Sequence, residues 1–284
     1  MAFGYAALAV GLGGCQESAS SGAREPDPPV DNSSDTSGRP SSGPTPSASV
    51  TPPEPPAIES ERFVTIDVPG FEPAVVAVPV GARDKRRVVL ATHGNYDRPE
   101  WQCEVWARIT KGRYFVLCPR GIARPDSPSA DDIRFTYKTN QELEREVDAA
   151  LAALAGSKYA RWVEGAPYVW TGFSLGAIMG VAIAKRRPSD FPELVLIEGG
   201  VDRFGDDVAR AFAKGGGKRV MFACAQAGCA KTARKRADRL EALGIETQVV
   251  DAGAIGHTYD GPVAEAVGSA FPAFMKERAG PETK

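Results

Sequence analysis

The distribution of hydrophobic positions divides the chain into two parts near residue 57. Residues 16–57 are rich in Ser, Pro, Gly, Thr and Asp and offer almost nothing to bury. Such a segment cannot offset the entropy lost on ordering, so we expect an extended, flexible linker there. From residue 58 onward, short apolar runs alternate with longer stretches of helical periodicity, which is the spacing of strand–helix units. This pattern predicts one α/β domain over residues 58–284.

The apolar runs and periodic segments predict the elements of that domain. The predicted strands are 61–68, 74–80, 87–92, 114–118, 168–171, 193–198, 219–224 and 246–250. The predicted helices are 99–109, 139–155, 177–185, 203–214, 230–243 and 262–276. The first two strands flank Pro69-Gly70, a turn signal, and should pair antiparallel. Residues 119–133 show no periodicity and are expected to form an irregular loop.

Charged residues on two predicted helices are expected to face solvent. Glu142, Glu144 and Glu146 lie on the helix 139–155, for which Thr139 or Asn140 is a plausible N-cap. The helix 230–243 contains a cluster of basic residues interrupted by Ala and Leu at core spacing. We interpret this cluster as a solvated helix face and not as a site for an anionic partner.

Charge and composition narrow the classes of function. The chain has 284 residues and a formal net charge of -2, which gives no reason to expect nucleic-acid binding. It contains only two histidines, His93 and His257. Any mechanism that needs an imidazole must use one of these two.

The N-terminus has the features of an export signal. Residues 1–14 are small or apolar and uncharged, and they end in Leu12-Gly13-Gly14-Cys15. This segment is too short to span a bilayer. Its ending resembles the lipobox of bacterial lipoproteins, and the resemblance implies a diacylated Cys15 as the mature N-terminus. We therefore expect a signal peptide at 1–14, a lipidated linker at 15–57, and a domain tethered to the membrane of the bacterial cell envelope.

The motif with the clearest chemical meaning is Gly172-Phe173-Ser174-Leu175-Gly176. It follows an apolar, β-prone run and precedes small and apolar residues that suit a helix. A strand, tight turn and helix in this order are typical of a nucleophile elbow, in which the backbone around the Ser is strained and only small residues fit on either side. Ser174 is therefore the candidate nucleophile.

Three motifs in a shared order give the chain its resemblance to a known superfamily. His93-Gly94 ends an early strand, the Ser174 motif follows a middle strand, and Gly256-His257 comes just after the last strand. In this order and placement they resemble the α/β-hydrolase superfamily, over residues 61–278. The resemblance implies a mostly parallel twisted sheet with helices on both faces. Among members of the superfamily, the domain is most similar to esterases, dienelactone hydrolases and polyester depolymerases.

The resemblance also implies a role for each motif. His257 would accept the proton of Ser174, because a Ser hydroxyl is a poor nucleophile without an imidazole partner. His93, which precedes the nucleophile in the chain, is the less favoured alternative for this base. The backbone N–H groups of Leu175 and Asn95 would bind the oxyanion.

The sequence offers two candidates for the carboxylate partner of His257. In this superfamily it commonly follows the penultimate strand, but here the residues after that strand are Ala225-Gln226-Ala227-Gly228. A minority of members place it after the preceding strand. Glu198 ends that strand and is the first candidate, and Asp202 is the second.

The four remaining cysteines are expected to form two local disulfides in an oxidising compartment. The simplest pairing joins Cys103 to Cys118 and Cys224 to Cys229. Their spacings match no zinc pattern, so we expect no metal site. No cofactor is expected either.

Two loops are candidates for substrate contacts. Trp101 or Trp106 would form the wall of an acyl pocket, and Arg120 would meet a substrate carboxylate or pair with Asp126. The sequence therefore predicts a monomeric serine hydrolase that acts on small or polymeric carboxylic esters through an acyl-enzyme. Two alternatives remain open: a binding protein of the envelope that has lost the chemistry, and a peptidase or thioesterase that uses the same residues.

Overall fold

The computed structural model describes residues 55–277. The predicted signal peptide, Cys15 and nearly all of the predicted linker lie outside the described residues. Within residues 55–277, no helix is both long enough and apolar enough to cross a membrane.

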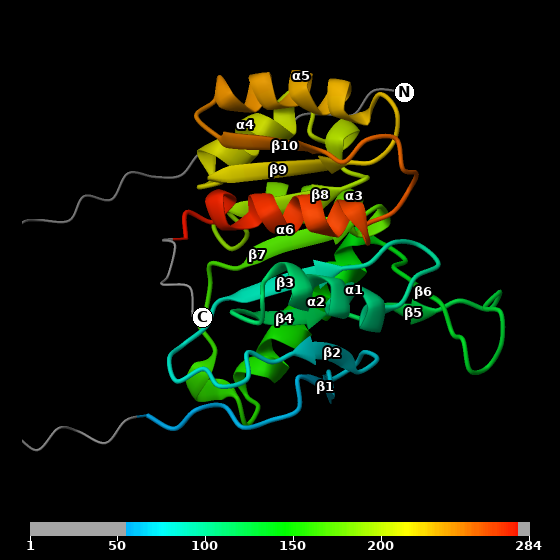
Figure 1. The fold of residues 1–284 in the computed structure, drawn as a ribbon, viewed down its shortest axis with the longest axis vertical. Coiled ribbons are helices and arrows are strands. Elements are labelled where there is room, and N and C mark those ends of the chain that lie inside the picture. The colour runs from blue at the N-terminus through cyan, green and yellow to red at the C-terminus, as the bar shows by residue number, and fades with distance from the viewer. Residues whose placement is uncertain (1–54, 278–284) are drawn as a thin grey trace, which may run out of the picture. The chain divides into compact units, whose positions relative to one another are not determined.

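The centre of the fold is an eight-stranded sheet with the order β1-β2-β4-β3-β7-β8-β9-β10 (Figure 1). Its strands are β1 (Phe63–Ile66), β2 (Ala74–Ala77), β3 (Val88–Thr92), β4 (Phe115–Cys118), β7 (Val169–Phe173), β8 (Glu193–Ile197), β9 (Arg219–Cys224) and β10 (Glu246–Asp251). Pairing is antiparallel between β1 and β2 and between β2 and β4, and parallel elsewhere. The mostly parallel sheet and the antiparallel opening pair confirm the sequence prediction.

Six α-helices of the described chain cover the two faces of this sheet. They are α1 (Pro99–Ile109), α2 (Asn140–Ala155), α3 (Leu175–Arg186), α4 (Asp206–Lys214), α5 (Cys229–Glu241) and α6 (Pro262–Phe274). Figure 1 shows α1 and α6 on the near face of the sheet. The central strands are buried along their whole length, as expected for parallel strands covered on both sides.

Alternate strand residues supply two separate cores. Leu90 and Trp170 pack with residues of α2, α3 and α4, whereas Val89 and Val169 pack with residues of α1 and α6. This division follows from the two-residue side-chain period of a strand. It fixes both helix layers and thereby the position of every loop at the carboxyl edge of the sheet.

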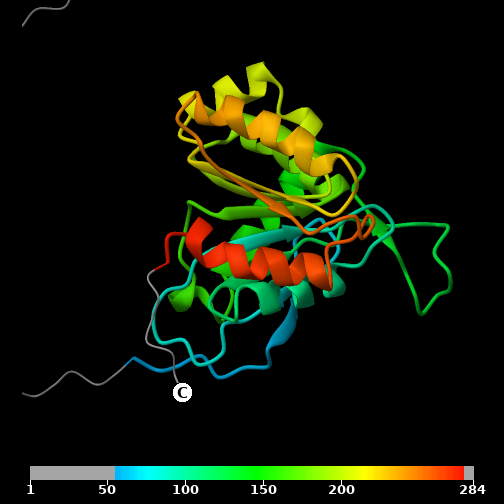
Figure 2. The ribbon, with the colours of Figure 1, turned by 45° about the horizontal axis from the view of Figure 1, so that its top comes forward.

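Two features of the fold differ from the sequence prediction. The stretch 119–133, expected to be irregular, contains the short strand β5 (Ile122–Ala123), and this strand pairs with β6 (Phe135–Thr136) just beyond the stretch. The loop between the two strands extends away from the sheet (Figure 2). The helix expected from residue 203 begins at Asp206. A separate 3₁₀ turn, Val201–Arg203, precedes it, and the extended backbone of Gly205 starts the new helix.

Both predicted disulfides are present at bonding distance. Cys103 in α1 joins Cys118 at the end of β4, and Cys224 at the end of β9 joins Cys229 at the start of α5. The second bridge closes a loop of a few residues at the carboxyl edge of the sheet.

Glu146 is buried, contrary to the expectation of a solvated face. Thr139 caps α2 as predicted, by accepting a hydrogen bond from the Glu142 N–H. The Glu146 side chain, however, lies beneath the hairpin and accepts a hydrogen bond of 2.8 Å from the Gly121 N–H. Burial raises the pKa of Glu146 to about 7. The helical pattern could not reveal this burial, because the covering residues come from the hairpin.

We expect Glu146 to make the stability of the domain fall as pH rises. Its pKa is 4.5 in the unfolded reference and about 7 in the fold, so the folded protein holds a proton that the unfolded chain releases across this window. The contribution lost above pH 7 is roughly 3 kcal/mol. In Glu146→Gln, urea unfolding at pH 5 and pH 8 should no longer show this loss. Glu144→Gln, a neighbouring change on α2, should retain it, and an equal loss in both variants would contradict the assignment.

Candidate active site

Ser174 lies in a sharp turn between β7 and α3. Its backbone has φ 50° and ψ -109°, a region that non-glycine residues rarely adopt. A Cβ on Gly172 would lie 2.6 Å from the Ala177 nitrogen, and one on Gly176 would lie 2.5 Å from the Thr92 carbonyl oxygen. Only glycine fits at either position, so the turn has the packing expected of a nucleophile elbow.

His257 lies beside Ser174 on the loop after β10. Its Nε2 is 2.8 Å from the Ser174 Oγ, and its ring packs against Phe173 with the centroids 4.8 Å apart. The N–H groups of Ile255 and Gly256 donate to the Ala225 carbonyl at 2.8 and 2.9 Å. The imidazole is thus held from two sides although its side chain is 46% exposed.

Glu198 lies immediately after β8 and points toward His257. Its side chain is 1% exposed, and its Oε2 is 3.5 Å from the His257 Nδ1. Its Oε1 accepts hydrogen bonds from the Ala225 N–H and, at 3.1 Å, from the Gln226 N–H. Among residues 55–277, Glu198 is the carboxylate within ion-pair distance of His257. Asp202, the second candidate, lies four residues further along in the 3₁₀ turn and is exposed.

Gln226 lies between Glu198 and His257, a position that the sequence did not predict. Its side-chain Nε2 is 2.5 Å from the Glu198 Oε2 and 2.7 Å from the His257 Nδ1. The only signal in the sequence is its position, because it follows the penultimate strand, where the superfamily that the sequence resembles commonly has its acid. The amide therefore occupies the place of a carboxylate without supplying a charge.

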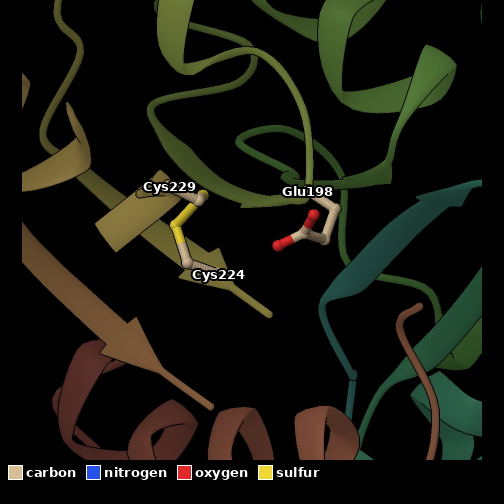
Figure 3. A group of neighbouring side chains, drawn as sticks. All are labelled: Glu198, Cys224 and Cys229. Carbon is tan, nitrogen blue, oxygen red and sulfur yellow. A yellow bond between two sulfur atoms is a disulfide. The ribbon is translucent and has the colours of Figure 1, made fainter. Parts of the chain in front are cut away.

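The disulfide beside Glu198 closes the loop that holds this carboxylate. Glu198, Cys224 and Cys229 offer ligand atoms within 4.8 Å of one another (Figure 3). The two sulfur atoms are bonded to each other, so the group presents no thiolate to a metal. Its structural effect is to fix the segment whose Ala225 and Gln226 N–H groups contact Glu198.

His93 is a buried residue that supports the loop after β3. Its ring nitrogens lie 2.7 Å from the Gly94 carbonyl and 2.9 Å from the Arg120 carbonyl, and the ring stacks on Tyr137. Burial lowers the pKa of His93, against the opposing charge of Asp97. Both ring nitrogens of His93 are occupied by these carbonyl contacts, so His257 and not His93 is placed to act as the base for Ser174.

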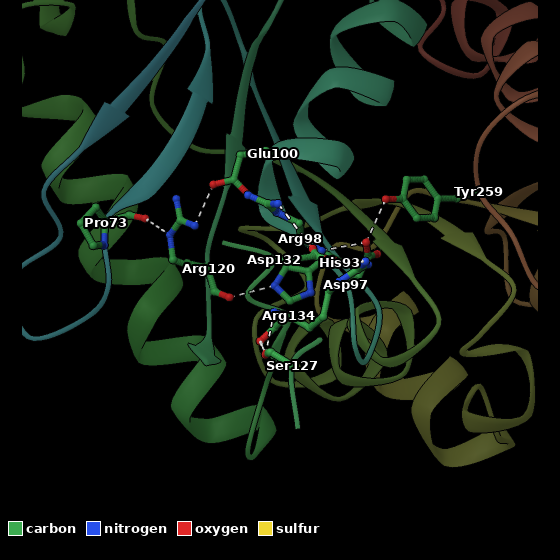
Figure 4. Close-up of polar contacts among 10 residues, drawn as sticks. All are labelled: Pro73, His93, Asp97, Arg98, Glu100, Arg120, Ser127, Asp132, Arg134 and Tyr259. Atoms are coloured by element: carbon green, nitrogen blue, oxygen red, sulfur yellow. Dashed lines mark hydrogen bonds and ion pairs between the residues drawn. The ribbon is translucent and has the colours of Figure 1, made fainter. Parts of the chain in front are cut away.

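Asp97 connects the loop after β3 to the His257 loop. One carboxylate oxygen accepts a hydrogen bond from the Gly94 N–H at 3.2 Å. The other accepts one from the Tyr259 hydroxyl at 3.1 Å (Figure 4). Tyr259 follows His257 by two residues and packs against Phe173. The sequence offered no signal for this connection, because the two residues are 162 positions apart.

The residues predicted to bind the oxyanion flank Ser174. Leu175 is the first residue of α3, where backbone N–H groups have no partner within the helix. Asn95 follows Gly94, and a Cβ on Gly94 would lie 3.5 Å from the Ser174 Cβ. The loop after β3 therefore passes directly beside Ser174. The assignment of the two N–H donors remains a prediction.

Trp101 and Arg120, the two predicted substrate contacts, occupy different environments. Trp101 is 40% exposed and contributes to a cleft of about 600 Å³. That cleft is also lined by Asn95, Tyr96, Phe173, His257 and Tyr259. The Arg120 guanidinium instead donates to the Pro73 carbonyl at 2.8 Å and pairs with Glu100 at 2.7 Å (Figure 4). Trp106, the alternative to Trp101, is fully buried and cannot line a pocket.

Comparison with known proteins shows similarity of fold only. No family model matches the chain, and no curated protein matches its sequence. Est1E from Butyrivibrio proteoclasticus is 13% identical, with 76% of this chain and 99% of that chain covered and a TM-score of 0.54. The hypothetical protein PA1622 from Pseudomonas aeruginosa PAO1 is 15% identical, with coverage of 78% and 100% and a TM-score of 0.52. The Bacillus cereus carboxylesterase is 18% identical, with coverage of 72% and 93% and a TM-score of 0.49.

The two structures with TM-scores of 0.54 and 0.52 are similar to this chain over most of its described residues. At such identities they show a shared architecture and not a shared activity. The chain therefore has the α/β-hydrolase fold.

The packing around the elbow makes Gly176 intolerant of any side chain. Its Cβ would meet backbone atoms of Thr92 and His93, which cannot move without shifting β3. We expect Gly176→Ala to lower the free energy of unfolding by about 1–3 kcal/mol, although Ala normally favours a helix. Gly165→Ala is the matched control, because nothing lies within 4 Å of its Cβ position. Urea unfolding of both variants tests this, and equal stabilities would contradict the close packing.

Proposed function

We propose that this protein is a serine hydrolase that cleaves carboxylic esters through an acyl-enzyme. The observation that supports this most directly is the 2.8 Å contact between the Ser174 Oγ and the His257 Nε2 at a strained strand-to-helix turn. A buried carboxylate, Glu198, stands behind the imidazole. Nucleophile, base and acid in this spatial order are the arrangement that activates a hydroxyl for acyl transfer.

The geometry supports a two-step mechanism. The Ser174 Oγ attacks the carbonyl carbon while the His257 Nε2 takes the hydroxyl proton, and the oxyanion is stabilised by backbone N–H groups of Leu175 and Asn95. The C–O bond to the alcohol then breaks, and the imidazolium returns its proton to the leaving oxygen. Water repeats these steps on the acyl-enzyme and releases the acid. Glu198 stabilises the imidazolium in both steps.

The cleft beside His257 favours an ester with an apolar substituent. Its walls include Tyr96, Trp101, Phe173 and Tyr259, which offer aromatic surface next to the nucleophile. A peptidase or thioesterase would use the same three residues. The alternative of a binding protein without catalytic activity was based on the absence of a carboxylate after β9. The position of Glu198 beside His257 makes that absence a weaker argument, because a carboxylate is available from another loop.

Ser174 should account for nearly all esterase activity. Ser174→Ala removes the nucleophile, so hydrolysis of p-nitrophenyl butyrate should fall by about 10⁴-fold or more, and labelling by a fluorophosphonate probe should disappear. Ser269→Ala, an exposed position on α6, is the control and should leave both unchanged. Absence of labelling in the unmodified protein would instead support the binding-only alternative.

Glu198, and not Asp202, should be required for a high turnover rate. Glu198→Gln keeps the size of the side chain but removes the charge that stabilises the imidazolium. We expect kcat to fall by about 10²–10⁴-fold with little change in KM. Asp202→Asn is the matched control, since Asp202 is exposed in the neighbouring turn. The assignment is wrong if Asp202→Asn shows the larger loss of kcat.

We further propose that the hydrolase is anchored in the cell envelope through Cys15. This proposal is supported by the apolar residues 1–14 and by the Leu12-Gly13-Gly14-Cys15 ending. Mass spectrometry of the mature protein from its native host should find a diacylglyceryl group on Cys15. Cys15→Ser should abolish this modification and release the protein from the membrane fraction, whereas an unmodified Met1 would contradict the proposal.

A further inference from the structure

The side-chain amide of Gln226 separates the candidate acid from the candidate base. Its Nε2 is 2.5 Å from the Glu198 Oε2 and 2.7 Å from the His257 Nδ1. The direct separation of Oε2 and Nδ1 is 3.5 Å, which is longer than a normal N–H···O hydrogen bond. The Gln226 amide therefore lies between the two side chains and contacts both, in place of a direct hydrogen bond between Glu198 and His257.

The carboxylate determines which atom of the amide points inward. A Gln side chain has an NH₂ donor and a carbonyl acceptor. The opposite orientation would place the amide oxygen against the Glu198 Oε2, and two acceptors cannot share that distance favourably. The NH₂ group has two hydrogens, which suffice for one bond to Glu198 and one to His257.

This orientation determines the tautomer of His257. Because Gln226 donates to Nδ1, Nδ1 must be the unprotonated nitrogen of the neutral ring. The proton is then on Nε2, which faces the Ser174 Oγ at 2.8 Å. A protonated Nε2 cannot accept the Ser174 proton, so this arrangement has the three residues in place but the base in the wrong tautomer.

We propose that Gln226 is a positioning residue that holds the substrate-free enzyme in this inactive tautomer, and that its withdrawal is a step of the catalytic cycle. When the amide leaves, the His257 Nδ1–H can bond directly to Glu198, and Nε2 becomes free to accept the Ser174 proton. The change moves one proton from Nε2 to Nδ1 through solvent and forms or breaks no covalent bond between heavy atoms.

The surroundings allow this movement while keeping Glu198 fixed. Glu198 Oε1 is held by the backbone N–H groups of Ala225 and Gln226, which do not depend on the Gln226 side chain. The loop that supplies them is closed by the Cys224–Cys229 bridge. Gln226 also lines a surface cleft with Glu198, Asp202 and Arg203, so its side chain has space to turn into. The Gln226 side chain can therefore move away while Glu198 keeps its two backbone hydrogen bonds.

The tautomer can be measured directly in the unmodified protein. The chain has only two histidines, so long-range ¹H–¹⁵N correlation spectra of ¹⁵N-histidine-labelled enzyme at a pH where His257 is neutral resolve both rings. A His257→Ala sample assigns the signals. We expect the His257 proton on Nε2 in the substrate-free enzyme. A proton on Nδ1 in that state overturns the proposal, with no dependence on any Gln226 variant.

Substitution of Gln226 tests the functional consequence. In Gln226→Ala the His257 proton should move to Nδ1, and the rate of acylation by p-nitrophenyl butyrate should rise by about two- to tenfold, the range that one net hydrogen bond represents. Gln226→Met keeps the volume without the donor and should show the same tautomer. Gln226→Asn, which retains a side-chain amide, is the control for effects of substitution on the loop itself. An unchanged tautomer and rate in both the Ala and the Met variants would overturn the proposal.

The inference rests on the proposed hydrolase function, and the two can fail separately. If the function is wrong, no variant shows Ser174-dependent hydrolysis. If only the proposed role of Gln226 is wrong, the enzyme is active and labelled at Ser174, while the His257 tautomer and the acylation rate do not respond to substitution of Gln226.

Discussion

The contact between the start of α3 and the end of β3 is the constraint on which the site depends. Gly176 approaches the Thr92 carbonyl so closely that no side chain fits, and its N–H donates to the His93 carbonyl at 3.1 Å. Gly199 approaches the Ser174 backbone in the same way from the other side. These contacts hold Ser174 in its strained conformation between two neighbouring strands. The close packing around the turn therefore maintains the backbone conformation of Ser174.

The order of the strands in the sheet brings the other residues of the candidate site close to Ser174. The loops after β3, β7, β8, β9 and β10 all leave the carboxyl edge of one sheet, so residues far apart in sequence become neighbours. Asp97 and Tyr259 join the first loop to the last, and Ala225 joins the β9 loop to both Glu198 and the His257 loop. The site is thus a ring of loops tied to one another by hydrogen bonds, with a half-exposed imidazole at its opening.

The sequence predicted the parts of this site that depend on local pattern. The Ser174 motif is a local sequence pattern, and the candidate roles of His257 and Glu198 come from the resemblance to the α/β-hydrolase superfamily together with their places at strand ends. Glu146, Gln226 and Asp97 could not be predicted, because each is defined by a partner from a distant loop: Gly121, His257 and Tyr259. Trp101 and Trp106 occur on the same predicted helix, and only the orientation of α1 against the sheet separates the exposed ring from the buried one.

The loop after β9 acts as a solvation shell for the Glu198 charge. Where water would surround a carboxylate in solution, two peptide dipoles, from Ala225 and Gln226, take its place. Because these donors belong to the backbone, they do not require a particular polar side chain in the loop, although proline, which has no N–H, could not supply either of them. This part of the environment of Glu198 is therefore supplied by the backbone of the loop after β9 and not by the polar groups of its side chains.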